Sequence, residues 1–430
     1  MRSFFQFEQR QTNYKTETMA GITTFLSIAY ILVVNPMILS QAGMDKGAVF
    51  TATALSAIIG SLLIGLLANF PVGISPSMGL NSFFTFSVCI GMGIEWETAL
   101  TGVFISWILF MILSLLKIRE KIINVIPQDL KHAIAAGIGF FVAFIGLKNA
   151  GIVIQSDATF VTVGELTSPT TLLALFGLGL AIILLVRGVS GAIFYSMVIT
   201  TIAGIFIGQI DRPDSIIGEI PSLAPTFGVV FTQLDQIFTF EILAVIFTFL
   251  FVAFFDTAGA LIAIASQAGL MKNNEIPQAG RALLADATAA VAGSIMGTST
   301  TACAVESSAG ISVGGRTGFT SVIIAGCFAI ALFFAPVLSI VTPEVTAPAL
   351  IIVGALMASE ISKINWKNTT IMISSFMTII MMPLTYSIAT GIALAFILYP
   401  LGMLASKKAK EVHPILYGLG LLFIGYFTFL

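Results

Sequence analysis

The chain has 430 residues, of which 57% are hydrophobic and only 9% are charged, against about 25% charged residues in an average soluble domain. This composition excludes a soluble globular protein, and a formal net charge of −2 offers no basic surface for nucleic acid. It indicates an integral membrane protein whose charged residues separate apolar segments.

Apolar segments long enough to cross a bilayer as a helix, ~20 residues, follow one another along the chain. Residues 1–19 precede them and carry scattered charges and amides, which predicts a cytoplasmic or interfacial segment whose Phe4, Phe5 and Phe7 enter the headgroup layer. Fourteen spans are then expected, at 21–40, 48–70, 76–93, 98–116, 131–147, 170–187, 190–209, 240–264, 281–297, 298–314, 318–340, 346–361, 369–383 and 385–405.

The apolar tail at 413–430 allows three interpretations. It is a fifteenth crossing, an interfacial helix, or the true last span if 369–383 and 385–405 form one long broken helix. The sequence leaves these alternatives open.

Basic residues orient the spans. With the N-terminus in the cytoplasm, all but Lys46, Lys148 and Arg212 of the 19 lysines and arginines fall in cytoplasmic segments or at cytoplasmic span ends. Because cytoplasmic loops of membrane proteins are enriched in Lys and Arg, both ends of the fourteen-span unit are expected in the cytoplasm. The expected location is the cell (plasma) membrane, with lipid around the protein.

Three pairs of segments occur in the same order in the two halves of the chain. They are 25–44 with 249–270, 70–86 with 293–311, and 127–151 with 343–366. Each half holds an odd number of spans, seven, so the second half enters the membrane from the opposite side and the chain is predicted to be an inverted repeat. Chance similarity between apolar segments is the alternative, and the shared order of three matches argues against it.

The most polar of these pairs interrupts its helix in both halves. Gly73, Pro76 and Gly79 interrupt the third span, and the hydroxyl-rich run 298–301 favours extended backbone in the tenth. Irregular backbone inside a bilayer occurs only where protein or a watery cavity satisfies its polar groups. Paired breaks at corresponding places therefore predict a transporter's binding site.

Two carboxylates lie alone in apolar segments, Asp256 midway along the eighth span and Glu306 just after the break in the tenth. A charged side chain near the bilayer centre costs at least ~3 kcal/mol on insertion scales, so it usually marks an ion, proton or substrate path, with a packed interhelical hydrogen bond as the alternative. Glu306 and Asn81 occupy corresponding points near the N-termini of half-helices, where free N–H groups face the site. Asp256 has no such helix end and is the expected proton carrier.

Aromatic residues beside these polar positions are candidates to cover a ligand, although packing is their commoner role. They are Phe83 and Phe84 after the first break, Phe255 beside Asp256, and Tyr30, which aligns with Phe254 across the repeat and adds a hydroxyl. The three cysteines lack CxxC spacing and the two histidines lie near predicted helix ends, so no metal, cofactor or disulfide is expected.

The motifs SPSMGLNSFFTF, FFDTAGALI and ADATAAVAGSIMGTSTTACAVESSAGISVGGRTG, with the opening AGITTFLSIAYILVVNP, resemble those of the AzgA-like purine nucleobase permeases, a branch of the nucleobase:cation symporter-2 superfamily. The resemblance covers nearly the whole chain. It implies a core domain of spans 1–4 and 8–11 and a gate domain of spans 5–7 and 12–14, with short antiparallel strands in spans 3 and 10. The corresponding ranges are 20–117 and 239–340 for the core, 118–210 and 341–430 for the gate, and 211–238 for an extracellular loop.

The resemblance also assigns roles to residues. It implies that Asp256 and Glu306 bind the base and couple its uptake to protons, and that the backbone of Ala304 and Val305 contacts the base. Thr257, Asn81 and the aromatic residues named above complete the expected contacts. The better-known nucleobase-ascorbate branch has an asparagine and a histidine where this chain has Ser307 and Ala260, which argues against uracil, xanthine or urate and for the purine branch.

The expected function is proton-coupled uptake of a purine nucleobase, guanine or hypoxanthine with adenine as a further candidate, by alternating access. An anion symporter of the same fold would need a positive site, a membrane-embedded enzyme would need a histidine near Ser307, Ser308 or Cys303, and a channel would not need paired breaks with single acids. The sequence leaves four points open. They are the preferred purine, whether protons or sodium ions drive uptake and in what number, which acid carries the proton, and whether the protein is a homodimer.

Overall fold

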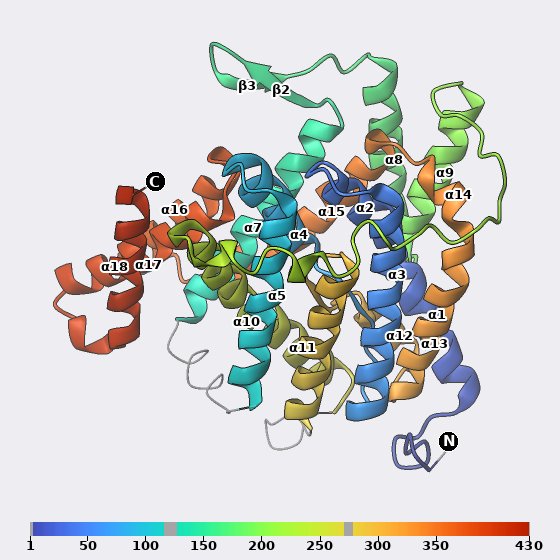
Figure 1. The fold of residues 1–430 in the computed structure, drawn as a ribbon, viewed down its shortest axis with the longest axis horizontal. Coiled ribbons are helices and arrows are strands. Elements are labelled where there is room, and N and C mark those ends of the chain that lie inside the picture. Colours follow the sequence, from blue (N-terminus) through green and yellow to red (C-terminus); the bar gives the residue numbers. More distant parts are fainter. Residues whose placement is uncertain (1–2, 116–126, 271–277, 430) are drawn as a thin grey trace.

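The structure is a computed structural model that describes residues 3–115, 127–270 and 278–429. Within these ranges, eight helical segments are long and apolar enough to cross a membrane, and several shorter apolar helices accompany them. The molecule has two ends that are easy to recognise in Figure 1. We call the end that carries a projecting β-hairpin the hairpin side, and the end where the first residues lie the N-terminal side.

The first half of the chain contains α1 (Tyr14–Ile28), α2 (Ile31–Ser40), α3 (Lys46–Leu63) with its π-helical extension η1 (Ile64–Ala68), β1 (Ile74–Pro76), α4 (Met78–Ser82) with the π-helix η2 (Phe83–Gly91), α5 (Trp96–Leu115), α7 (Gln128–Asn149), the hairpin β2 (Val153–Ser156) and β3 (Phe160–Val163), α8 (Pro169–Val186) and α9 (Ala192–Phe206). The second half contains α10 (Phe240–Gln267), α11 (Ala279–Met296), β4 (Thr301–Cys303), α12 (Ser307–Val313), α13 (Gly318–Ala331), η5 (Leu332–Phe334), α14 (Ala335–Ser339), α15 (Pro343–Ala358) with η6 (Ser359–Lys363), α16 (Thr369–Leu384), α17 (Ile388–Ala405) and α18 (Pro414–Phe429). Each of the fourteen predicted spans contains at least part of one of these helices, so the predicted all-α polytopic fold with two short strands in broken spans is confirmed.

Side-chain caps fix where several of these helices begin. The side chains of Asn13, Asp45 and Ser168 accept hydrogen bonds from the backbone N–H groups at the starts of α1, α3 and α8. Such caps satisfy N–H groups that have no partner inside the helix. The sequence therefore carries local start signals in addition to its apolar periodicity.

The helices pack in two sets. In one set α11 packs against α3 and α5, and α13 packs against α1 and α3. In the other set α7 packs against α15 and α16, and α8 packs against α9 and α15. The first set consists of helices in the ranges expected for the core, and the second of helices in the ranges expected for the gate.

The helices α7 and α15, which occupy the same place in the two halves, approach each other closely through glycines. A Cβ atom added to Gly139 would lie 2.6 Å from the carbonyl oxygen of Gly354, and one added to Gly146 would lie 2.9 Å from the N atom of Ile351. Only residues without a side chain allow two helices to pack at this separation. The close approach joins the two halves of the repeat inside the second set.

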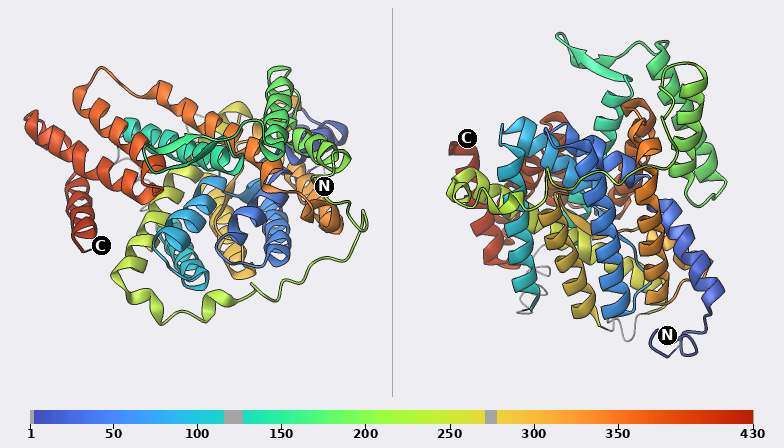
Figure 2. Two further views of the ribbon diagram at one scale, coloured as in Figure 1. Left: turned by 90° about the horizontal axis from the view of Figure 1, so that it is seen from above. Right: turned by 45° about the vertical axis from the view of Figure 1, so that its right-hand side comes forward.

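The segment 211–238 wraps around the hairpin side of the first set (Figure 2). Hydroxyl groups attach it there: Thr51 donates to the Pro221 carbonyl at 2.8 Å, and Thr226 of the segment donates to the Met296 carbonyl at 2.9 Å. The segment thus connects α9 to α10 along the outside of helices α3 and α11.

The N-terminal segment differs from the prediction. Phe5 and Phe7 are buried, with ring centroids 5.6 and 5.7 Å from that of Phe319, and only Phe4, which is 58% exposed, remains free to enter a headgroup layer. The prediction that all three rings enter the headgroups is therefore wrong for Phe5 and Phe7. The start of α13 provides an aromatic partner that a scan of the first residues alone does not reveal.

The C-terminal tail forms a separate helix, α18, which packs against α17. Helices α16 and α17 pack side by side and are joined by the turn at 385–387. Residues 369–383 and 385–405 therefore do not form one long broken helix. Figure 1 shows α16, α17 and α18 at the edge of the molecule farthest from α1 and α13.

Candidate functional site at the strand crossing

The two broken spans meet where β1 and β4 pair in an antiparallel arrangement. Ile74 lies opposite Cys303, and Pro76 lies opposite Thr301. Backbone hydrogen bonds extend the pairing on both sides, from the Ser77 N–H to the Thr300 carbonyl and from the Ala304 N–H to the Gly73 carbonyl. Each strand is then followed by a helix, α4 or α12, so the predicted meeting of two short strands from spans 3 and 10 is confirmed.

Serine side chains satisfy the extended backbone that leads into β1. The N–H groups of Val72, Gly73 and Ile74 donate to the hydroxyls of Ser321, Ser307 and Ser61 at 2.9, 3.0 and 3.1 Å. These hydroxyls come from α13, α12 and α3. Extended backbone at this depth is tolerated because neighbouring helices supply the missing hydrogen-bond partners.

Glu306 lies immediately before the first residue of α12 and is half-buried. Its Oε1 accepts a hydrogen bond of 2.9 Å from the hydroxyl of Tyr30, a buried residue at the break between α1 and α2. Val305, next to Glu306, is 54% exposed, so the acid lies at the boundary between protein interior and open space. The structure thus brings together two predicted site residues that are 276 positions apart in the sequence.

Asn81 lies in a different environment, a fully buried network of amides and hydroxyls. Its Nδ2 donates to Oδ1 of Asn35 at 2.6 Å, and Nδ2 of Asn35 donates to the hydroxyls of Thr53 and Thr298 at 2.8 and 3.0 Å. The sequence analysis missed Asn35. Its signal was an amide in the apolar run VVNP, directly before the proline inside α2.

Several polar atoms around the crossing are buried and have no hydrogen-bond partner in the described part of the chain. They are Asn81 Oδ1, Ser82 Oγ, Thr85 Oγ1, Ser299 Oγ and Thr301 Oγ1. A buried polar atom without a partner costs about 1–3 kcal/mol, and such atoms are scarce in native proteins. Their concentration in the two broken spans gives this place an unused capacity to bind a polar ligand.

Thr257 connects α10 to the second broken span through a further acid. Its hydroxyl donates to Oδ2 of Asp286 in α11 at 2.8 Å, and the Cys303 thiol contacts Oδ1 of Asp286 at 3.6 Å. All three residues are buried. The sequence analysis did not single out Asp286, although an acid within the alanine-rich segment ADATAA was a signal for a buried role.

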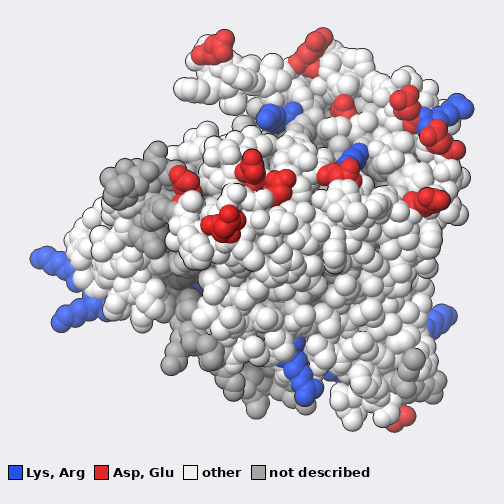
Figure 3. Space-filling view, in the orientation of Figure 1, with Lys and Arg blue, Asp and Glu red and all other residues white. Residues whose placement is uncertain are grey.

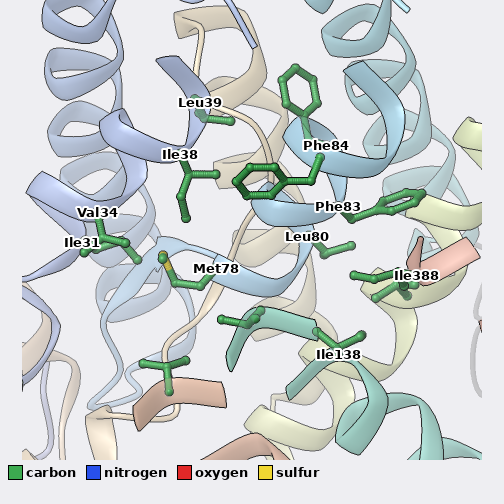
Figure 4. Packing of buried hydrophobic residues seen from close by; sticks show 14 of the residues in the cluster. Ile31, Val34, Ile38, Leu39, Met78, Leu80, Phe83, Phe84, Ile138 and Ile388 are labelled. Atoms are coloured by element: carbon green, nitrogen blue, oxygen red, sulfur yellow. The ribbon is translucent and has the colours of Figure 1, made fainter. Parts of the chain in front are cut away.

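The remaining predicted residues lie elsewhere. Phe83 and Phe84 are fully buried in the packed interior (Figure 4). The ring centroids of Phe83 and Phe249 are 5.0 Å apart. Phe83 and Phe84 therefore do not face open space in this conformation. The positions of Asp256 and Phe255 belong to α10, but their side chains lie outside the described part of the structure.

The backbone of Ala304 is already used within the protein. Its N–H donates to Gly73, and its carbonyl accepts from the Ser307 N–H at 3.0 Å. The contact between the base and the backbone of Ala304 and Val305 that the resemblance implies stays a prediction. Val305 follows Ala304 and leads directly to Glu306.

Comparison with known proteins identifies relatives of the whole chain. Residues 15–394 match the permease family. The guanine/hypoxanthine permease PbuG of Bacillus subtilis is 53% identical over 439 residues and covers all of both chains. The adenine permease AdeP of Escherichia coli is 39% identical and covers 98% of this chain and 94% of that protein.

A solved structure supports the fold. The transmembrane domain of the cyanobacterial bicarbonate transporter BicA superimposes with a TM-score of 0.62, covering 89% of this chain and 97% of that one. Because the two sequences are only 17% identical, the likeness concerns the fold alone.

Proposed function

Because the chain belongs to the permease family and is a nucleobase permease rather than an enzyme, we propose that it takes up guanine or hypoxanthine together with protons. The relatives that carry this proposal are named as guanine/hypoxanthine and adenine permeases. The observation on which the site proposal depends is the pairing of Glu306 with Tyr30 beside the unpartnered polar atoms of the strand crossing.

The chemistry of a purine fits this place. A nucleobase is neutral and flat, and its edge alternates N–H donors with ring-nitrogen and carbonyl acceptors. The carboxylate of Glu306 can accept from the donors, while the hydroxyls of Ser299 and Thr301 can either donate or accept. A ligand of this kind would satisfy the polar atoms that the protein itself leaves without partners.

Proton coupling is the second part of the proposal. Glu306 binds the base as an anion, Asp256 brings the proton, and one proton accompanies each base. The hydrogen bonds from Thr257 through Asp286 to Cys303 support this assignment because they join the residue after Asp256 to the strand that leads to Glu306. A movement of α10 would be transmitted to the site through these contacts.

The third part of the proposal is alternating access, in which a core domain moves against a gate domain. The core consists of spans 1–4 and 8–11, and the gate consists of spans 5–7 and 12–14. On the hairpin side, Tyr386 of the α16–α17 turn joins the two sets of helices. Its carbonyl accepts from the Ser87 hydroxyl at 3.1 Å, and its ring lies 5.6 Å from Phe86 and 5.5 Å from Phe141 between centroids. On the N-terminal side, Val305, which precedes α12, and Val313, the last residue of α12, are 54% and 43% exposed. These differences support a site closed toward the hairpin side and open toward the N-terminal side.

We also propose that the N-terminal side faces the cytoplasm. Figure 3 shows Asp and Glu side chains gathered on the hairpin side of the visible face, while several Lys and Arg side chains lie on the opposite half. This arrangement agrees with the enrichment of basic residues on the cytoplasmic side of membrane proteins. In this orientation the conformation described here is the one that releases substrate inward.

Uptake into proteoliposomes tests the function. Radiolabelled guanine should enter vesicles saturably, faster when the outside is acidic, and unlabelled hypoxanthine should compete. Asp256→Asn should remove the dependence on the pH gradient, whereas Glu219→Gln, a change of an exposed acid in the segment 211–238, should leave it intact. Uptake that does not saturate, or that is unaffected by both the gradient and Asp256→Asn, contradicts the proposal.

An anion symporter is the second candidate, favoured only by the fold of the bicarbonate transporter. The site residues described above supply carboxylates, amides and hydroxyls but neither lysine nor arginine, which disfavours an anion. Labelled bicarbonate and sulfate should therefore not enter the same vesicles above the level of empty liposomes.

A further inference from the structure

A cavity lies on the N-terminal side, away from the strand crossing. It has a volume of about 610 Å³ and lies between the N-terminal segment, the end of η1, the end of α10 and the starts of α11 and α13. Its polar lining consists of Gln6, Gln9, Arg10, Gln11, Gln278 and Arg316. No aspartate or glutamate lines it among the described residues.

Two arginines, Arg10 and Arg316, line this cavity, and their guanidinium groups have no carboxylate partner in the described ranges. Nη1 of Arg10 donates to the carbonyls of Asn69 and Arg316, both at 2.7 Å, and Nη1 of Arg316 donates to the carbonyls of Ile311 and Gly315. The salt bridges found among the described residues join Glu360 to His132 and Lys363, and neither arginine takes part in them. Neutral carbonyls therefore hold both side chains in place and leave their positive charge uncompensated by contact.

Glu17 is the acid whose charge acts on Arg10, but its carboxylate forms its hydrogen bonds with other residues. Its carboxylate accepts from the hydroxyls of Thr12, Thr317 and Thr320 at 2.8, 2.8 and 2.6 Å, and from the N–H of Arg316. Burial lowers the pKa of the Arg10 guanidinium and Glu17 opposes this change. The acid thus stabilises the positive charge nearby without forming an ion pair with it.

We propose that this cavity binds a phosphate-bearing anion, in the cytoplasm if the orientation proposed above is correct. Guanidinium groups match phosphate oxygens with two parallel N–H donors, and glutamine amides add further donors. The volume falls in the range of about 300–1,000 Å³ that is common for small-molecule sites, which leaves room for an organic phosphate as large as a mononucleotide. The phosphate group comes from a free anion or from a lipid headgroup.

The position of Arg10 gives such binding a consequence for transport. Arg10 bonds Asn69, which leads into β1, and Arg316, which follows the helix that Glu306 begins. An anion held by both arginines would fasten the N-terminal segment to the ends of both broken spans. A ligand shifts the equilibrium between two transporter conformations only if it binds one of them more tightly than the other. We expect the anion to favour the conformation described here and therefore to slow guanine uptake several-fold.

The experiment measures binding in the full-length protein without guanine, so its result does not depend on the transported substrate. The melting temperature of purified protein in phosphatidylcholine nanodiscs is followed while inorganic phosphate or guanosine monophosphate is added. Inorganic phosphate and guanosine monophosphate should each raise the melting temperature by several degrees.

The test variant is Gln9→Glu/Gln278→Glu, which places negative charge in the cavity while the hydrogen bonds of Arg10 and Arg316 persist. Both glutamines are exposed, so this variant should fold and should lose the stabilisation by either probe. Gln41→Glu adds one negative charge, against two in the double variant, to a separate cavity near Trp96 and should keep the stabilisation by both probes. Guanine binding to the double variant should remain, which separates this proposal from the proposed function.

Three outcomes decide the matter. Stabilisation by phosphate or the nucleotide that disappears in Gln9→Glu/Gln278→Glu supports a free anion. Stabilisation seen only when phosphatidylglycerol replaces phosphatidylcholine, and lost in the same variant, supports a lipid headgroup. The proposal is overturned if neither probe nor phosphatidylglycerol stabilises the protein, or if the double variant responds like the unaltered chain.

Discussion

The two broken spans share a backbone plan, a short strand followed by a helix, but they present different chemistry to the crossing. After β1 comes Asn81, a neutral amide that is fully buried and held by Asn35. After β4 comes Glu306, an acid that is half-buried beside the exposed Val305 and held by Tyr30. The inverted repeat therefore provides the same backbone arrangement twice, and residue identity decides which copy is neutral and fully buried and which is ionisable and half-buried.

This division has a physical reason. An isolated carboxylate in the dry network of Asn35 and Asn81 would lose its hydration without gaining a positive partner, which costs several kcal/mol. An amide meets no such penalty because its donors and acceptors pair locally. The acid lies at the edge of the packed interior, next to the exposed Val305.

Replacing Glu306 should have the largest effect. Glu306→Gln keeps the shape of the side chain and a carbonyl for Tyr30 but removes the charge, so we expect guanine uptake to fall by ~100-fold, given that hydrogen bonds to charged groups contribute about 1.5–3 kcal/mol. Initial rates in proteoliposomes measure this. Glu241→Gln, an exposed acid at the start of α10, is the control. Uptake at the unaltered rate in Glu306→Gln would remove the acid from the site.

Replacing Asn81 should be next in size and should also affect folding. Asn81→Ala leaves Oδ1 of Asn35 without its donor, so the free energy of unfolding should fall by about 1–3 kcal/mol and guanine affinity by roughly tenfold. Thermal unfolding and equilibrium binding report the two effects. Ser82→Ala removes a hydroxyl that has no partner in the described structure and should be neutral for stability. Equal losses in both variants would show that the amide network has no special role.

Removing the Tyr30 hydroxyl should have a smaller effect. Tyr30→Phe deletes one hydrogen bond to Glu306, worth about 0.5–1.5 kcal/mol, so the KM for guanine should rise about two- to tenfold while the protein stays folded. Concentration-dependent uptake measures the change. Tyr195→Phe, in a half-exposed position of α9, should leave KM as it is. If both variants behave alike, the Tyr30–Glu306 bond does not contribute to binding.

Replacing Thr257 should have the smallest effect on uptake. Thr257→Val removes the hydrogen bond to Asp286, and we expect a loss of roughly fivefold in rate, in line with one buried hydrogen bond of about 1 kcal/mol. The dependence of uptake on the pH gradient should weaken as well, which a purely structural role would not cause. Cys303→Ala removes only a weak thiol donor and should stay within about twofold. A gradient response that is unchanged in Thr257→Val would separate Asp286 from proton coupling.

The local pattern of the sequence was sufficient for the frame of the molecule. Apolar runs of span length located the helices, and the order of the similar segments indicated two inverted halves. Gly73, Pro76 and the threonine run before Cys303 predicted broken helices, because these residue types disfavour regular helix wherever they occur. The isolated Asp256 and Glu306 stood out for the same reason, since a charge in an apolar run is visible without knowledge of its neighbours.

Tertiary structure decided which side chains meet. It paired Tyr30 with Glu306 and Asn35 with Asn81, and it buried Asp286 against Thr257 and Cys303. It also buried Phe83 and Phe84 in the packed interior, and it packed Phe5 and Phe7 against Phe319 rather than in a headgroup layer. These polar contacts join residues that lie between 17 and 276 positions apart in the chain. They depend on how helices rotate and approach one another, and apolar periodicity does not contain that information, because any face of a membrane helix can be apolar whether it meets lipid or protein.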